Sequence, residues 1–266
     1  MTAIGASARP YSAAWVVSDY WEMIKRSLRH IRHDPEQLAN VTLQPVLIVV
    51  LMTFVFGGAL KTGTHGSYIN FVMPGIFVVT AAFAAITTTT SVAADMREGV
   101  IDRFRSLPMA KSSVLAGHVI ADLARSMIGL AVTIAVGYAV GFRPAAGVTG
   151  WAAAIGVILL VTFALSWLAA LIGLLGPSLE AAQQLAAIVI IPVFLSSALV
   201  PASTMPSWLR VVTANQPITQ AIDALRALLA GQPAGSHLSL ALAEFAGIIV
   251  VAFALATVLF RRTASA

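Results

Sequence analysis

The sequence predicts an all-α integral membrane protein with about six transmembrane helices. Of its 266 residues, 59% are hydrophobic and only 10% are charged, and the mean hydropathy is +0.89. A soluble domain carries about 25% charged residues, so this chain has too few polar side chains to cover a surface in water. Lipid is therefore its expected solvent. The chain has no cysteine, which excludes disulfides and thiolate metal sites.

Six runs of mostly apolar residues have the roughly 20-residue length that a transmembrane helix needs. They are residues 41–60, 68–94, 114–140, 151–176, 181–200 and 240–260. We expect one domain over residues 1–266, with a cytoplasmic or interfacial segment 1–40, a six-span bundle 41–260 and a cytoplasmic tail 261–266.

The distribution of positive charge predicts the orientation of these spans. With an even number of spans both ends lie on one side, and the loops on that side carry 11 of the 16 Lys and Arg residues, against 4 on the other side. Arg125, inside the third span, is the sixteenth. Because cytoplasmic loops are rich in Lys and Arg, we expect a multi-pass protein of the cell membrane with both termini in the cytoplasm. Basic residues placed at membrane edges do not predict a nucleic-acid partner.

Of the segments outside the spans that have helical periodicity, one lies near the N-terminus and one on the outer side. Near the N-terminus, an apolar face of Trp21, Ile24, Leu28 and Ile31 is opposed by basic residues, which is typical of a helix lying on the inner leaflet. On the outer side, residues 218–229 predict a short helix that begins after Pro217 and ends at Gly231. Asp223 and Arg226 lie three apart on this helix and are expected to pair. Arg210 is expected in an ordinary loop.

Motifs for several chemistries are absent from the sequence. There is no G-x-x-x-x-G-K-[ST] phosphate-binding loop, no H-E-x-x-H metal motif and no G-x-S-x-G nucleophile elbow. The five histidines fall on different segments. We therefore expect no catalytic residue, no metal site and no cofactor bound by this chain.

Polar residues within the spans leave two interpretations open. His118, Asp122 and Arg125 share one face of the third span and form either a locally paired cluster near the cytoplasmic edge or a proton relay. The hydroxyl run 87–91 either bonds back to its own helix or lines a substrate path. The candidate path residues are Thr87, Thr88, Thr90, Ser91, Gln184, Ser196 and Ser197.

The cytoplasmic loop 95–113 contains a predicted short amphipathic helix. Val100, Phe104 and Leu107 form its apolar stripe, and Pro108 ends it. Its Arg-Glu-Gly start and Leu-Pro close resemble the coupling helix of type 2 ATP-binding-cassette exporter permeases. Other segments match that family in the same order along nearly the whole chain. They are Asp34-Pro35-Glu36, Gln44-Pro45, Met205-Pro206-Ser207-Trp208-Leu209, Asn215-Gln216-Pro217-Ile218 and Ala224-Leu225-Arg226.

The resemblance, which is closest to the daunorubicin-resistance permeases, implies a function. It implies a permease subunit that dimerises with a second permease copy and docks two copies of a separate ATPase, which bind ATP and Mg. The cargo would be a hydrophobic drug or lipid moving outward. The implied coupling residues are Arg97, Glu98, Gly99, Asp102, Arg103, Phe104, Arg105, Leu107 and Pro108. The implied outer lid contains Trp208, Asn215, Pro217, Asp223 and Arg226.

Two other classes of protein remain as alternatives. A secondary transporter or channel without an ATPase partner would need charged or ion-coordinating groups at the middle of the membrane. A structural membrane anchor would have no need for the long outer segment 201–238.

Overall fold

The protein is an all-helical bundle in the residues that its computed structural model describes, which are 35–57, 68–97 and 112–263. The predicted helix near the N-terminus and most of the predicted coupling helix lie outside these ranges. The longer elements are α2 (Pro35–Val50), which runs into a π-helical turn η1 (Leu51–Phe56), α3 (Tyr68–Arg97), α5 (Ser112–Ala139), α6 (Val148–Leu175), α7 (Leu179–Phe194) and α10 (Gly235–Thr263). Between α7 and α10 lie a 3-10 turn η2 (Ala202–Thr204), α8 (Ser207–Ala214) and α9 (Pro217–Leu229).

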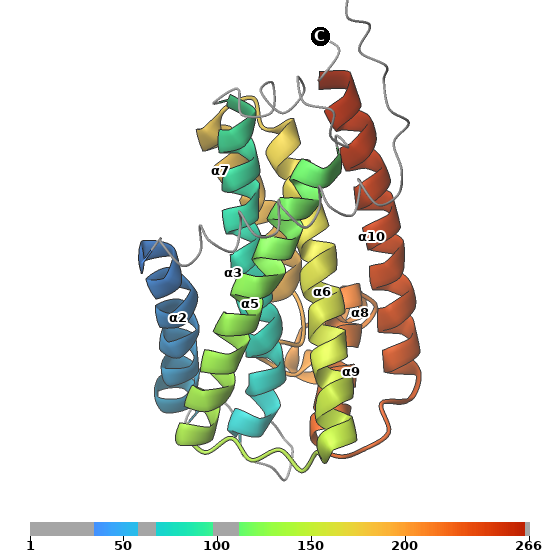
Figure 1. The fold of residues 1–266 in the computed structure, drawn as a ribbon. Helices are drawn as coiled ribbons and strands as arrows, with labels where there is room; N and C mark the ends of the chain where they lie inside the picture. The colour runs from blue at the N-terminus through green and yellow to red at the C-terminus, as the bar shows by residue number, and fades with distance from the viewer. Residues whose placement is uncertain (1–34, 58–67, 98–111, 264–266) are drawn as a thin grey trace, which may run out of the picture.

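Successive long helices run in opposite directions (Figure 1). The end of α3, the start of α5 and the end of α10 lie toward one end of the bundle, at the top of the view. The α5–α6 and α9–α10 connections lie at the other end, and α8 and α9 lie in the lower half of the bundle, where α9 packs against α6 and α10. We refer to the first as the upper end of the bundle and to the second as the lower end.

Four helices in the described part of the chain are long and apolar enough to cross a membrane. They cover Tyr68–Met96, Leu115–Ala139, Val148–Leu175 and Gly235–Phe260, so the second, third, fourth and sixth predicted spans agree with the structure. The first and fifth predicted spans coincide with shorter apolar helices, Leu43–Phe56 and Leu179–Phe194.

The fifth apolar helix ends earlier than the sequence predicts. We expected it to continue to residue 200, but α7 stops at Phe194 because the backbone finds other partners. The Ser196 hydroxyl donates to Val193 O and accepts from the Ala198 amide at 3.1 Å, and the Ser197 amide donates to Thr219 Oγ1 at 3.2 Å. These bonds replace the helical ladder, as buried backbone groups require.

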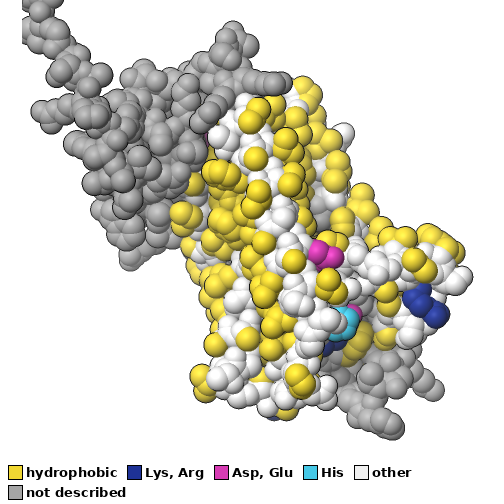
Figure 2. Space-filling model, turned by 90° about the vertical axis from the view of Figure 1, so that its right-hand side faces the viewer, with side chains coloured by type: hydrophobic (Ala, Val, Ile, Leu, Met, Phe, Trp, Pro, Cys, Tyr) yellow, Lys and Arg dark blue, Asp and Glu magenta, His cyan; other side chains and the backbone are white. Residues whose placement is uncertain are grey.

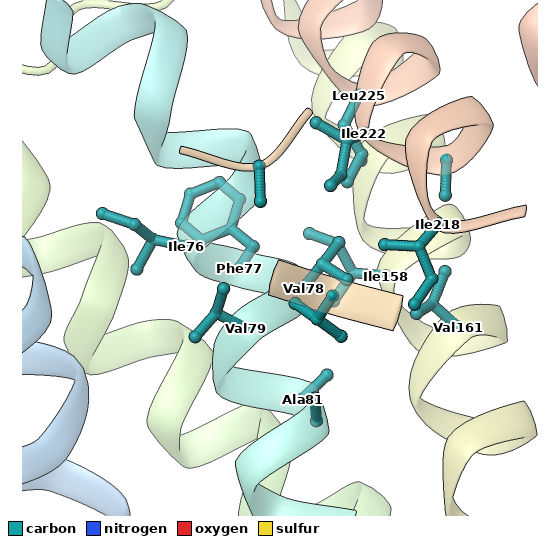
Figure 3. Close-up of a cluster of buried hydrophobic side chains, with 14 of the residues drawn as sticks. Ile76, Phe77, Val78, Val79, Ala81, Ile158, Val161, Ile218, Ile222 and Leu225 are labelled. Atoms are coloured by element: carbon teal, nitrogen blue, oxygen red, sulfur yellow. The ribbon is translucent and has the colours of Figure 1, made fainter. Parts of the chain in front are cut away.

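Helix α3 is the central helix of the bundle. In its apolar stretch 78% of the residues are buried inside the protein, against 17% for α10. α3 packs against α6, α7, α5 and α9. Figure 3 shows Val78 of α3 beside Ile158 of α6, and Val161 of α6 beside Ile218 of α9, all within one buried cluster.

Helix α10 forms much of an outer face of the bundle. This face is largely hydrophobic (Figure 2), and it includes the exposed side chains of Val250, Val251, Leu255 and Val258. A continuous apolar surface of this kind is suited to lipid or to another apolar helix rather than to water.

The structure has a helix, α9, at the residues 218–229 where the sequence predicts one, but its surroundings differ from those of a surface helix. Pro217 occupies the first turn, where its missing amide hydrogen is not needed. The chain then turns at Gly231, which has φ of +70°. The predicted apolar face is buried, and the buried residues extend around the helix: Ile218, Thr219, Gln220, Ala221, Ile222, Ala224, Leu225 and Leu229. Helix α9 packs against α10, α6 and α3, so it lies inside the bundle.

Candidate functional site

Two ionisable side chains lie deep within helix α5. Asp122 is fully buried and Arg125 is 5% exposed, and Arg125 lies near the midpoint of Ser112–Ala139. Charged groups inside a membrane span are costly and usually serve a function. Asp122 and Arg125 are therefore the first candidate site. We call them, together with His118 on the same helix face, the α5 polar cluster.

Asp122 contacts a residue from a different helix. The Ser166 hydroxyl of α6 donates a hydrogen bond to its Oδ2. The other carboxyl oxygen, Oδ1, is buried without a hydrogen bond of ordinary geometry among the described residues, and the Thr88 hydroxyl of α3 lies near this carboxyl group. Helices α6 and α3 approach each other closely at Gly173 of α6. A Cβ added to Gly173 would lie only 2.7 Å from the backbone oxygen of Thr89 on α3. A buried carboxyl oxygen with an unused acceptor is suited to binding a proton or a polar group.

Arg125 contacts the hydroxyl run on α3. Its Nη1 donates to Thr87 Oγ1 at 3.2 Å, and that hydroxyl donates in turn to Ala84 O at 2.7 Å. Thr87 therefore uses both its acceptor and its donor. This bond links the middle of α5 to α3.

His118 belongs to the same face of α5 and lies nearer to the upper end. Its Nε2 lies 2.9 Å from Asp95 Oδ2 of α3, with both side chains partly exposed. Asp95 and His118 are close to the two helix ends, Arg97 and Ser112, that border residues 98–111. The pair thus joins the helices on either side of the predicted coupling helix.

The α5 polar cluster is more widely connected than the sequence predicts. Of the two interpretations left open by the sequence, the first pairs His118, Asp122 and Arg125 locally near the cytoplasmic edge, whereas their bonds also reach α3 and α6. Asp95 and Ser166 were not predicted as partners. The signal for Ser166 was available, since it is a polar residue four positions from Thr162 in an otherwise apolar, uncharged span.

The other candidate path residues do not gather in one place. Thr90 Oγ1 donates to Thr87 O at 3.0 Å, a bond within its own helix, and Ser91 lies half-buried nearby. Gln184 is exposed on α7, whereas Ser196 and Ser197 are buried in the turn that follows it. Ser196 and Ser197 hold backbone and α9 in place, so their visible role is structural.

A second polar group, which is partly buried, lies on α9, and we call it the α9 clamp. The predicted pair of Asp223 and Arg226 is confirmed, with Arg226 Nη1 lying 2.7 Å from Asp223 Oδ1. Arg226 also donates to Ser197 Oγ at 2.9 Å and to Phe71 O at 3.1 Å, and its guanidinium lies over the Phe71 ring. One side chain thus joins α9 to α3 and to the turn after α7.

The remaining lid residues are located around α8 and the start of α9. Trp208 is 71% exposed on α8, and Asn215 is exposed and bonds back to Val211 O. Arg210 lies in α8, so its assignment to a loop is wrong. Its guanidinium donates hydrogen bonds to Ser203 O and Met205 O. These carbonyls lie just before α8 and outside any long helix, so they are free to accept from a side chain of α8.

The predicted coupling residues are mostly outside the described residues. Arg97 is the last residue of α3. The others, Glu98, Gly99, Asp102, Arg103, Phe104, Arg105, Leu107 and Pro108, lie in the range 98–111 and have no described geometry.

The sequence is similar to known transport proteins along most of its length. It matches the ABC-2 type transporter family over residues 18–230. It is 32% identical to a daunorubicin resistance ABC transporter permease protein of Streptomyces coeruleorubidus, over 98% of this chain and 92% of that protein. It is 29% identical to a probable doxorubicin resistance ABC transporter permease protein of Mycobacterium tuberculosis, over 90% and 87% of the two chains. It is also 31% identical to nodulation protein J of Rhizobium meliloti, over 74% of each chain.

These similarities agree with the apolar helices and the multi-pass architecture described above. The family match covers most of the chain, including α3, α5, α6 and the α9 clamp. The chain therefore belongs to the ABC-2 type transporter family and is a multi-pass membrane protein of the permease type.

Proposed function

We propose that this chain is the membrane-spanning subunit of an ATP-driven exporter that moves a hydrophobic drug or lipid outward. The observation that carries the proposal is its similarity, over 98% of its length, to a daunorubicin resistance permease. A separate ATPase subunit would bind ATP and Mg and would supply the energy, because the chain contains no phosphate-binding loop.

Six crossings of the plasma membrane, with both termini in the cytoplasm, belong to this proposal. α2 and η1 form one continuous helical segment, Pro35–Phe56, and at 1.5 Å per residue it would be about 33 Å long. α7 is shorter, and α8 and α9 fill the lower half of the bundle beyond it. The upper end would face the cytoplasm, because the ends of α3 and α5 that border the basic segment 98–111 lie there.

Two permease copies and two ATPase copies would form the working complex. Residues Glu98–Leu107 would contact the ATPase, and the pair of His118 with Asp95 would transmit their movement to α3 and α5 together. This pair supports the idea because it connects the two helices nearest to residues 98–111.

The outer end of the substrate path through the bundle would be closed by α9. In its present position α9 is buried against α3, α6 and α10, and the α9 clamp holds it there. Movement of α9 away from Phe71 and Ser197 would open this end of the bundle, so the clamp is the proposed outer lid contact.

Purification and transport together test the proposal. The chain, carrying a tag, is purified from cells that also express a candidate ATP-binding-cassette ATPase from the same organism. We expect the ATPase to co-purify, and we expect proteoliposomes of the complex to transport daunorubicin only with hydrolysable ATP. Transport that is equally fast with a non-hydrolysable analogue, or by the permease alone, would refute the energy source.

A secondary transporter remains the second candidate because of the α5 polar cluster. Asp122 and Arg125 provide buried ionisable groups near the middle of α5, as a secondary transporter would need. A proton-driven transporter would move substrate in response to a pH gradient without ATP, and Asp122→Asn would abolish that movement. An ATP-driven exporter would show no transport under the same gradient.

A further inference from the structure

A small pocket lies between α2, α3 and α5. Its volume is about 40 Å³, and its polar lining is formed by Gln44 of α2, Thr80 and Thr87 of α3 and Ser126 of α5. Ile48 and Phe83 are among the residues that form its apolar wall. The pocket lies beside the α5 polar cluster, since Thr87 also accepts the hydrogen bond from Arg125.

Ser126 distinguishes this pocket from an ordinary packing gap. Its side chain is 6% exposed, and its Oγ is buried with no hydrogen-bond partner among the described residues. Other hydroxyls nearby donate to carbonyls of their own helices: Thr80 to Ile76 O at 2.8 Å and Thr133, also on α5, to Gly129 O at 2.6 Å. Buried polar groups normally have a partner. Ser126 therefore places an unused hydroxyl hydrogen in the wall of the pocket.

The helix that covers the pocket is at the edge of the bundle and is irregular. α2 packs against α5 and α3 and lies at one side of the fold (Figure 1). Leu43 and Leu47 on its outward face are exposed. α2 contains Pro45, which lines the pocket, and it continues directly into the π-helical turn η1. Proline removes one bond of the helical ladder, and π-helical turns often mark functional sites.

The lining determines which chemical group the pocket can take. Its polar groups are hydroxyls and one amide, all neutral, and the remainder of the wall is apolar. A cavity needs about 10–15 Å³ to hold one water molecule, so a pocket of about 40 Å³ admits a group of a few heavy atoms. A neutral hydroxyl, carbonyl or amide on an apolar body fits these conditions, whereas a free ion does not.

We infer that the pocket between α2, α3 and α5 is a substrate subsite that binds a neutral hydrogen-bonding group of an amphipathic molecule, with Ser126 as the donor. This inference rests on the proposed export function, which supplies the amphipathic substrate.

Cysteine labelling tests the subsite without requiring transport. Because the chain has no cysteine, Ser126→Cys introduces a single thiol into the pocket. In membranes without ATP, we expect methyl methanethiosulfonate to modify this thiol and daunorubicin to slow the modification at least threefold. Thr133→Cys is the control, since Thr133 is fully buried on the same helix and does not line the pocket. Its modification should be slow and unaffected by daunorubicin.

Transport kinetics give a second measurement. Loss of one neutral hydrogen bond corresponds to a change of roughly three- to tenfold in binding. We expect Ser126→Ala to raise the half-saturating daunorubicin concentration by that factor at unchanged maximal rate and abundance. Thr133→Val, which removes a hydroxyl bonded within its own helix, should leave the half-saturating concentration unchanged.

The two measurements separate this inference from the proposed function. If daunorubicin does not protect Ser126→Cys, or protects Thr133→Cys equally, the subsite is refuted even when ATP-driven transport is intact. If daunorubicin protects Ser126→Cys but transport does not depend on ATP, the subsite stands and the proposed function is refuted.

Discussion

The guanidinium carbon of Arg226 lies 3.7 Å from the centre of the Phe71 ring, and Arg226 Nε donates to the carbonyl of that same residue. A single side chain of α9 thus binds both the ring and the backbone of α3. A cation over an aromatic ring contributes more when water is excluded, and Arg226 is largely buried. α9 is therefore held inside the bundle at a defined contact.

Arg226→Ala should destabilise the protein. The substitution removes the hydrogen bonds to Phe71 O, Ser197 and Asp223. A hydrogen bond to a charged group contributes about 1.5–3 kcal/mol to the free energy of unfolding. Asp223 is 31% exposed, so solvent reduces the penalty of leaving it unpaired. We expect a net loss of about 2 kcal/mol, measured as a lower thermal midpoint in detergent. Arg210→Ala is the control, because Arg210 is exposed on α8. Equal midpoints for the two variants would contradict the α9 clamp.

Gly75→Ala should also destabilise the protein. A Cβ at Gly75 would lie 2.1 Å from Ala198 O, a backbone atom that cannot rotate away. The turn after α7 would have to shift, and overpacking of this kind costs about 1–3 kcal/mol. Gly156→Ala on α6 is the matched control, since nothing lies within 4 Å of its added Cβ, and alanine there should stabilise the helix by about 0.5–1 kcal/mol. We expect the thermal midpoint to fall for Gly75→Ala and to rise for Gly156→Ala. An unchanged midpoint for Gly75→Ala would mean that the turn after α7 can move freely.

The pair of His118 with Asp95 should act as one unit. We expect His118→Ala and Asp95→Ala each to reduce transport while the ATPase still co-purifies, because both separate α3 from α5 near the coupling segment. The double variant should be little worse than either single variant, since groups in contact are not additive. The measurement is ATP-driven uptake into inverted vesicles, and fully additive losses would show that the two residues act separately.

Glu98→Gln and Phe104→Ala test the coupling segment. We expect both variants to reach the membrane at normal abundance, to lose the ATPase during purification and to lose transport. Loss of one partner of a desolvated charge pair costs about 2–5 kcal/mol, and a large aromatic side chain often dominates an interface. Lys111→Ala, outside the predicted helix, should be mild. If both variants retain the ATPase and transport normally, residues 98–107 are only a connector.

Single cysteines test the orientation. In intact cells, Ser67→Cys and Ser236→Cys should react with a membrane-impermeant maleimide, because both residues are assigned to the outer side by the distribution of Lys and Arg. Ser106→Cys should react only after the cells are opened. External labelling at residue 106 would reverse the proposed orientation.

Much of the fold could be predicted from local pattern. Apolar runs predicted α3, α5, α6 and α10, and the periodicity of residues 218–229 predicted α9 almost to its ends. The pair of Asp223 with Arg226 followed from a spacing of three residues on one helix. Each of these features depends on neighbours within a few turns, so the sequence contains the required information directly.

The contacts between helices were not predicted in the same way. Asp95 was expected in a loop and proved to be the partner of His118, and Ser166 was not expected to contact Asp122. The position at which two helices approach depends on small residues such as Gly75 and Gly173, which allow backbone to lie against backbone. No periodic pattern specifies which helix will face them.

The sequence by itself determined that the chain is an all-α membrane protein, where most of its long helices lie and that it carries no phosphate-binding loop. Composition and local spacing are sufficient for these properties. Only the tertiary structure decided that α7 ends at Phe194, that α9 is buried on several sides and that Ser126 lines a pocket without a partner among the described residues. Each of these outcomes depends on which distant backbone or side chain satisfies a buried polar group, and that is settled when the helices pack together.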